Sequence, residues 1–179
     1  MGVYHVYSDY SATRKRGGYG YVVVDYDARK LETYGSGQCP LHNTYNGELL
    51  AGIEGLLKVE PAAAALVVWH VDNQCVTYID PSRKRRRLRT TRKLIARFQA
   101  AKDRLGPGVD VRIVWHQQAR RNVFHRVCHE LARAAAGIDA SRKLAYWLLE
   151  TANVENQPVP GAADFSENQA APNTVFLGD

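Results

Sequence analysis

Three carboxylates in this sequence stand where strands end or helices begin, which are places where a fold can gather side chains. Asp9 closes an apolar segment, Glu48 lies early in a helical segment, and Asp72 closes a second apolar segment. Carboxylate oxygens are ligands that Mg²⁺ prefers, and two such ions can activate a water and stabilise a leaving oxygen. The residue types therefore point to metal-dependent hydrolysis of a phosphodiester, provided that the fold brings the three together.

Each carboxylate also has a simpler interpretation. Asp9 would begin a turn, Glu48 would be an acid on a helix surface, and Asp72 would cap a short helix. Clustered carboxylates repel one another, so a shared site needs metal ions or substrate to offset that cost. The order of the three residues and the sequence around them favour the shared site over three independent structural roles.

The elements that must position these residues follow from the pattern of apolar side chains. Strands are predicted at residues 3–9, 19–26, 31–38, 66–71 and 109–115. Helices are predicted at residues 43–58, 90–105, 122–136 and 141–150, with a short one between Asp72 and Pro81. The first three strands would form an antiparallel meander and the other two would run parallel. We therefore expect an α/β protein with a five-stranded mixed sheet and helices on both faces.

The bulk properties narrow the class of protein. A chain of 179 residues with 45% apolar content suits one domain of ordinary size. No apolar run approaches the roughly 20 residues of a membrane span. The three cysteines, Cys39, Cys75 and Cys128, are far apart and show no zinc-binding spacing. This unpatterned count suits a reducing compartment, so we expect a cytoplasmic protein without a membrane association.

The charge is distributed unevenly along the chain. The net charge is +6, but fifteen Lys and Arg residues and only two acids lie between Arg83 and Arg126, so that stretch carries about +13. Its densest part is Arg83, Lys84, Arg85, Arg86, Arg87 and Arg89. A solvated helix face is the ordinary interpretation of a charge run, but like charges packed so closely repel. This density favours a surface that binds a nucleic acid.

The order of strands, acidic helix and acid-terminated strand resembles the type 1 ribonuclease H family. Asp9-Tyr10-Ser11 is similar to the family's Asp-Gly-Ser, with Tyr in place of Gly. Glu48-Leu49 matches the helical Glu-Leu, and Asp72-Asn73 resembles Asp-Ser. The resemblance spans about residues 3–136. It implies a ribonuclease H-like fold in which Asp9, Glu48 and Asp72 hold two Mg²⁺ or Mn²⁺ ions.

The fourth ligand position departs from the family pattern. The family commonly has Ala-Asp-x-Leu-Ala, where this chain has Cys128-His129-Glu130-Leu131-Ala132. Alignment of the Leu-Ala pair places His129 at the fourth ligand, as in other nucleases of the wider superfamily. A neutral imidazole is a softer ligand that suits Mn²⁺ somewhat better than Mg²⁺. Glu130 is the rival ligand, and a surface histidine is the structural alternative for His129.

The resemblance also suggests contacts with substrate. Asn43, Thr44 and Asn46 stand near the family's Thr-Asn-Asn, which touches RNA 2′-hydroxyls, although their order is scrambled here. The basic segment falls where family members often insert a basic helix that grips the DNA strand. His116 lies near the position of a family histidine that helps product leave. For His125, a phosphate-facing or solvated position is favoured over a metal pair with His129.

These observations predict an endoribonuclease that cleaves the RNA strand of RNA–DNA hybrids and leaves 5′-phosphate and 3′-hydroxyl ends. The alternatives are a DNA or junction nuclease of the same superfamily and an inactive domain that only binds nucleic acid. Residues 1–138 would form the catalytic domain, residues 139–152 an additional helix, and residues 153–179 an extended or disordered tail. No obligate protein partner is evident, and we expect a monomer.

Overall fold

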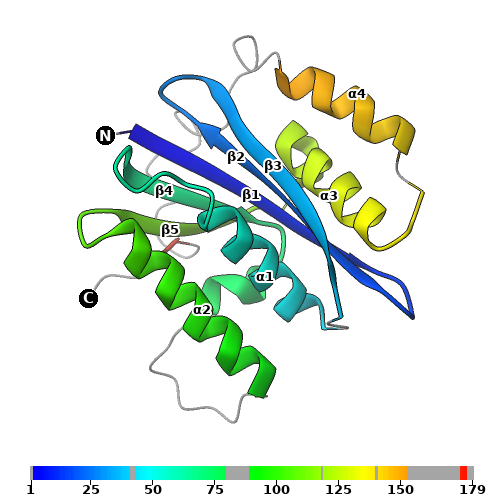
Figure 1. The fold of residues 1–179 in the computed structure, drawn as a ribbon, viewed down its shortest axis with the longest axis horizontal. Helices are drawn as coiled ribbons and strands as arrows, with labels where there is room; N and C mark the ends of the chain where they lie inside the picture. The colour runs from blue at the N-terminus through cyan, green and yellow to red at the C-terminus, as the bar shows by residue number, and fades with distance from the viewer. Residues whose placement is uncertain are drawn as a thin grey trace.

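The structure is a computed structural model that describes residues 2–40, 43–79, 89–117, 119–139, 141–152 and 174–176. Along the chain, the strands are β1 (Gly2–Ala12), β2 (Gly17–Asp25), β3 (Lys30–Cys39), β4 (Ala64–Val71), β5 (Asp110–Trp115) and β6 (Thr174–Phe176). The helices are α1 (Thr44–Leu56), α2 (Arg89–Leu105), α3 (Val123–Ala135) and α4 (Ser141–Ala152), with short 3-10 helices at η1 (Gln74–Tyr78) and η2 (Ala119–Arg121). Figure 1 shows the path of the chain through these elements.

The strands form one mixed sheet in the order β3-β2-β1-β4-β5-β6. β1 pairs with β2, and β2 with β3, in antiparallel fashion, whereas β4 lies parallel to both β1 and β5. The predicted arrangement of three antiparallel and two parallel strands is thereby confirmed. The short antiparallel strand β6 on β5 was not predicted, because it falls inside the segment expected to be an extended or disordered tail.

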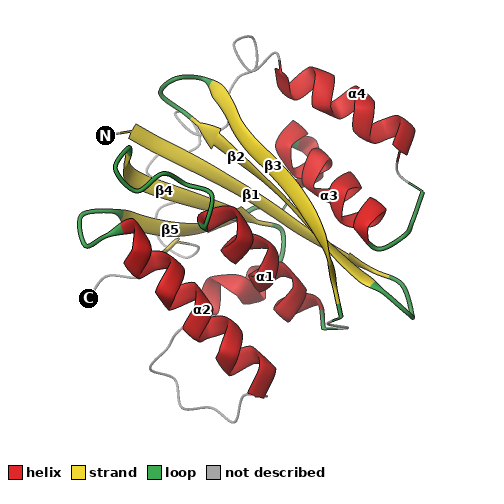
Figure 2. Ribbon diagram, viewed as in Figure 1, coloured by secondary structure: helices red, strands yellow, loops and turns green. Residues whose placement is uncertain are grey.

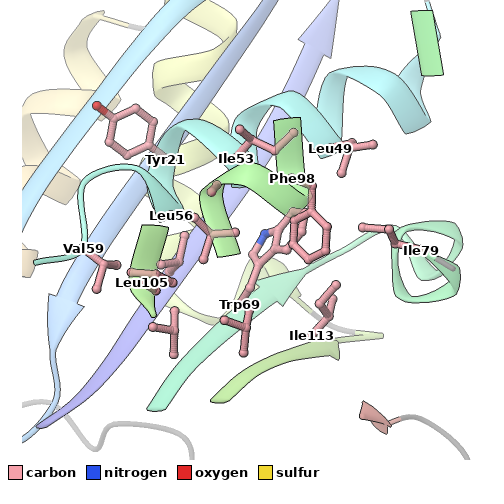
Figure 3. Packing of buried hydrophobic residues seen from close by; sticks show 14 of the residues in the cluster. Tyr21, Leu49, Ile53, Leu56, Val59, Trp69, Ile79, Phe98, Leu105 and Ile113 are labelled. Atoms are coloured by element: carbon pink, nitrogen blue, oxygen red, sulfur yellow. The ribbon is translucent and has the colours of Figure 1, made fainter. Parts of the chain in front are cut away.

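Helices cover both faces of the sheet, as Figures 1 and 2 show. α1 and α2 lie on one face, and α3 lies on the other with α4 packed against it. Side chains of a strand alternate between the faces, so Val6 joins the core under α1 while Tyr7 packs against α3. Figure 3 shows the larger core, where Ile53 of α1 and Phe98 of α2 pack over Trp69 of β4.

The helix ends follow the predicted capping residues. The side chain of Asn43 accepts a hydrogen bond from the amide of Asn46 at the start of α1. Asn122 Oδ1 accepts from the amides of the second and third residues of α3. Gly106 and Gly137, which follow α2 and α3, have positive φ angles of 97° and 77°, a conformation that favours glycine.

The predictions of a basic nucleic-acid-binding segment and of no membrane span can be compared only with the described residues. Most of the basic segment, residues 83–88, lies outside them, and α2 begins at Arg89. In the part of the chain that the structure describes, no helix combines the length and apolar character needed to cross a membrane.

Candidate active site

The parallel pairing of β1 and β4 brings Asp9 and Asp72 to the same edge of the sheet. Tyr7 is in register with His70, so the residues two positions further along the chain, Asp9 and Asp72, lie at the same level. Asp9 is still part of β1, where it pairs with Gly20 of β2. Asp72 directly follows the last residue of β4. Since parallel strands end at one edge, and ligand sites of open α/β sheets form there, this register explains why residues 63 positions apart in the sequence meet.

Glu48 reaches the same edge from the first turns of α1. The main-chain amide of Tyr10 donates hydrogen bonds to Asp9 Oδ1 at 2.7 Å and to Glu48 Oε1 at 3.2 Å, and so ties the helix to the end of β1. Asp9, Glu48 and Asp72 each offer an oxygen, and the three oxygens lie within 4.8 Å of one another. The structure therefore brings together all three predicted carboxylates.

The surroundings of Glu48 suit a cation. Its side chain is only 1% exposed, and within the described residues its Oε2 atom has no hydrogen-bond partner. Burial, followed by the charges of Asp9 and Asp72, raises the pKa of Glu48 well above its usual value of 4.5. A buried, unpaired carboxylate oxygen beside two other carboxylates fits a divalent cation, which would supply the missing positive charge.

His129 joins the site through Asp9. Its Nδ1 atom lies 2.6 Å from Asp9 Oδ2, and the carboxylate of Asp9 is largely buried. Glu130, the rival candidate, instead has its Oε2 atom 3.7 Å from Arg133 Nε on the same helix. Of the two candidates for the fourth ligand, His129 contacts the carboxylate group, whereas Glu130 lies near Arg133.

Two glycines allow α3 to approach the sheet closely enough for this contact. A Cβ atom at Gly20 would overlap the carbonyl oxygen of Cys128 and lie 2.7 Å from the Cβ atom of Leu131. A Cβ atom at Gly18 would overlap the carbonyl oxygen of Ala132. The backbone of α3 thus packs directly on β2, one turn from His129.

No protein-family model and no curated protein matches this sequence. Solved structures do match. The N-terminal RNase H domain of Rv2228c from Mycobacterium tuberculosis is 19% identical with a TM-score of 0.63, and the match covers 76% of this chain and 98% of that one. RNase H1 from Halobacterium salinarum is 18% identical with a TM-score of 0.56, again over 76% and 98%. LC11-RNase H1 in complex with an RNA/DNA hybrid is 15% identical with a TM-score of 0.58, over 74% and 98%.

The chain has the ribonuclease H fold. The matches extend over nearly the whole length of these neighbours, and the predicted fold class is confirmed. In this ribonuclease H fold the three carboxylates come from the second half of β1, the residue after β4 and the first turns of α1. They are the residues that the sequence resemblance predicts as metal ligands.

The tyrosine that departs from the family's Asp-Gly-Ser has a structural explanation. The ring of Tyr10 lies against the backbone of Gly47, and a Cβ atom at position 47 would overlap that ring. The ring is 7% exposed and packs beside the start of α1. Tyr10 and Gly47 therefore act as a matched pair that accommodates a large residue next to Asp9.

The predicted 2′-hydroxyl contacts differ in their accessibility. Asn43 and Thr44 are both exposed, and Asn43 uses its side-chain oxygen to cap α1. Asn46 is 3% exposed, and its Oδ1 atom accepts a 2.9 Å hydrogen bond from the hydroxyl of Thr91 in α2. Thr91 was missed from the sequence because nothing near it in the chain signals a bond to a residue 45 positions away.

The histidines on the α3 face were only partly anticipated. His70 is a buried strand residue, as predicted, but its two ring nitrogens contact His5 and His116. The prediction that His125 is phosphate-facing or solvated is wrong, since His125 is 3% exposed and packs edge-on against Tyr7 and His116. Residues 5 and 7 share a face by strand periodicity, but only the three-dimensional register reveals the contact with His70.

Proposed function

We propose that this protein is a metal-dependent endoribonuclease that hydrolyses the RNA strand of RNA–DNA hybrids. The observation that carries the proposal is the group of Asp9, Glu48 and Asp72, with oxygens within 4.8 Å of one another at the strand ends of a ribonuclease H fold. The unpaired buried oxygen of Glu48 supports a cation there. RNase H1 enzymes are among the structural neighbours, and one of them was solved with an RNA/DNA hybrid.

The metal would be Mg²⁺ or Mn²⁺, with two ions held by Asp9, Glu48, Asp72 and His129. Bound ions of this kind activate a water and stabilise charge on the scissile phosphate and the leaving oxygen. The protein's own contribution is to fix the ligands. Tyr10 N orients Asp9 and Glu48, and His129 Nδ1 holds the second oxygen of Asp9. His129 would act as the fourth ligand or as the group that orients Asp9.

The basic segment from Arg83 to Arg89 would hold the hybrid through its phosphates, because closely spaced cations bind a polyanion without reading its sequence. Asn43, Thr44 and Asn46 would recognise the RNA strand near its 2′-hydroxyls. Asn43 and Thr44 are exposed and accessible for that purpose, whereas Asn46 is buried. Discrimination of a hybrid would come from such contacts and from the shape of the duplex. His116 would assist departure of the product.

Three free cysteines support a cytoplasmic location, because disulfides are rare in reducing compartments. The carboxylates, the basic segment and the fold all lie in one chain, so we propose that the protein acts as a monomer on nucleic acid.

The test is a comparison of end-labelled RNA–DNA hybrid, double-stranded RNA and double-stranded DNA, each incubated with the protein in Mg²⁺ and in Mn²⁺. We expect cutting confined to the RNA of the hybrid, with 5′-phosphate and 3′-hydroxyl ends. Cutting of DNA alone would move the function to a DNA or junction nuclease. Hybrid binding without cleavage in either metal would show a domain that only binds nucleic acid.

A further inference from the structure

Three histidine rings form a nearly coplanar row between the sheet and α3. His5 Nδ1 lies 2.7 Å from His70 Nε2, and His70 Nδ1 lies 2.6 Å from His116 Nε2. Neighbouring ring centroids are 4.9 Å apart in both pairs, with interplanar angles of 18° and 28°. These distances describe in-plane nitrogen-to-nitrogen hydrogen bonds, each linking one ring to the next.

The row is enclosed by aromatic side chains. Tyr7 stacks on His70 with centroids 4.4 Å apart and planes 9° apart, and Tyr26 stacks on His5 at 5.0 Å. His5 and His70 are 5% and 4% exposed. Because the bond between His5 and His70 is buried, it faces little competition from solvent, whereas the bond to His116 is partly buried.

Each bond of the row joins an N–H of one ring to a bare nitrogen of the next ring. Burial, then the nearby His116, lowers the pKa of His5 to about 4. An imidazole with a single N–H donates through one nitrogen and accepts through the other, which is how His70 can bond both of its neighbours. Both bonds must therefore run in the same direction, and the tautomer of His116 is linked to that of His5.

The outer end of the row, His116, follows the strand next to the one that Asp72 follows. Val71 is in register with Trp115, so His116 follows β5 at the level at which Asp72 follows β4. The amide of His116 donates to the carbonyl of Val71 at 2.9 Å, and the indole of Trp115 donates to the carbonyl of Asp72 at 3.1 Å. The main chain at His116 is thus tied to the main chain that presents Asp72.

We propose that His70 and His5 are positioning residues that hold the imidazole of His116 in one orientation beside Asp72, from which it acts on the hybrid. This role of His116 rests on the function proposed above. A metal site is the other use for several histidines, but in the described residues the one group with three ligand atoms close enough for an ion is the carboxylate group. His70 uses both of its ring nitrogens on other histidines, so neither nitrogen is left to bind an ion. The row is therefore suited to positioning a side chain.

Two substitutions of His70 separate its two hydrogen bonds. His70→Asn keeps a polar atom near the place of Nδ1, which faces His116, and His70→Gln keeps one near the place of Nε2, which faces His5. We expect His70→Gln to slow hybrid cleavage about fivefold, which is the effect of one lost hydrogen bond on a positioned group. His70→Asn keeps the bond to His116 and should cleave at a rate closer to that of wild type. Val68→Ala, a buried position on the same strand, controls for general loss of packing.

A double substitution tests whether His70 acts through His116. If it does, His70→Gln combined with His116→Gln should cleave no more slowly than His116→Gln alone. Losses that multiply, or equal losses in His70→Gln and Val68→Ala, would overturn the proposal and leave His70 a packing residue.

A second measurement needs neither metal nor substrate. In ¹⁵N-labelled protein, we expect a scalar coupling across the hydrogen bond between His70 and His116, and we expect ring nitrogen shifts of His116 that show one tautomer. His5→Phe should change those shifts, whereas Val68→Ala should not. Averaged shifts of His116 in the wild-type protein would refute the row. Intact coupling in a protein that cuts no hybrid would refute the proposed function and leave the positioning of His116 established.

Discussion

Glu48 occupies a position that is unfavourable for a charge unless a cation is present. It is almost fully buried, one of its oxygens has no partner among the described residues, and two further carboxylates lie nearby. Such an arrangement costs folding free energy in the absence of metal, as expected for a site shaped for binding rather than for stability.

The first prediction concerns Glu48→Gln in the metal-free protein. The pKa of Glu48 is higher in the folded protein than its usual value of 4.5. Between these two pKa values, the native state keeps a proton that the unfolded state releases. The free energy of unfolding therefore falls as the pH rises from about 4.5 to the folded-state pKa. The variant should therefore be more stable than wild type at pH 7 to 8, by at least about 1 kcal/mol. Urea unfolding in EDTA at pH 5, 7 and 8 measures the difference, which should widen with pH.

Saturating Mg²⁺ or Mn²⁺ provides the control for Glu48→Gln. The metal should stabilise wild type and should stabilise the variant much less, because binding to the native state adds to its stability. A variant that is no more stable than wild type in EDTA at any of these pH values would contradict the account of Glu48.

The second prediction concerns His129, whose Nδ1 atom contacts Asp9. His129→Ala should reduce hybrid cleavage by roughly 10- to 100-fold, the usual effect of losing a ligand-orienting group at a metal site. His129→Asp should retain activity and shift the preferred metal from Mn²⁺ toward Mg²⁺. Steady-state rates in both metals measure these effects. Glu130→Gln is the matched control, and a loss equal to that of His129→Ala would make Glu130 the ligand instead.

At the residue scale, the sequence predicts those site residues whose positions follow from the local pattern of strands and helices. Asp9 ends the apolar part of β1, Asp72 follows the apolar strand β4, and Glu48 lies early in α1 after the capping residue Asn43, so their approach could be expected. The bond from Thr91 to Asn46 and the row from His5 to His116 could not, because each joins residues distant in the sequence through a register that only the folded sheet defines.

At the element scale, the contact between α3 and β2 determines where His129 lies. The third prediction is that Gly20→Ala pushes α3 away from the sheet, because the added methyl group would overlap the carbonyl of Cys128. We expect a loss of about 1–3 kcal/mol in the free energy of unfolding and a fall in hybrid cleavage as His129 leaves Asp9. Thermal unfolding and the cleavage assay measure the two effects.

Gly108→Ala is the matched control, since a Cβ atom at that position would meet nothing within 4 Å. It should leave both stability and cleavage close to wild type. Equal behaviour of the two alanine variants would show that close packing of α3 on β2 is not what holds His129 in place.

The element boundaries were predictable to within a few residues where apolar periodicity is strong. The helix expected at 90–105 is α2 at Arg89–Leu105, and that expected at 141–150 is α4 at Ser141–Ala152. The predicted short helix after Asp72 is the 3-10 helix η1. β6 was missed because three residues are too few to show a strand period, and its pairing depends on an edge offered by β5.

At the scale of the whole molecule, charge is concentrated between Arg83 and Arg126 while the rest of the chain is net acidic. The fourth prediction is that replacing Arg85, Arg86 and Arg87 with Gln weakens hybrid binding. The slope of the logarithm of the binding constant against the logarithm of the salt concentration should also become less steep by about two to three. This is because about one fewer counterion is released on binding for each phosphate contact that is lost. Fluorescence anisotropy over a range of salt concentrations measures this slope.

The control for charge replaces three other exposed basic residues, Arg29, Lys30 and Lys58, which lie outside the stretch from Arg83 to Arg126. This triple Gln variant has the same net charge as the first. If both variants flatten the salt slope equally, net charge alone and not the basic segment drives binding.

The decisive experiment measures hybrid cleavage by Asp9→Asn and hybrid binding by the same protein. Asp9 contacts His129, shares the Tyr10 amide with Glu48 and belongs to the carboxylate group, so its charge should be indispensable for chemistry. We predict that cleavage in Mg²⁺ and Mn²⁺ falls by about three orders of magnitude while binding stays within about threefold of wild type. Cleavage by Asp9→Asn at a rate near that of wild type would contradict a metal-dependent site built on Asp9, Glu48 and Asp72.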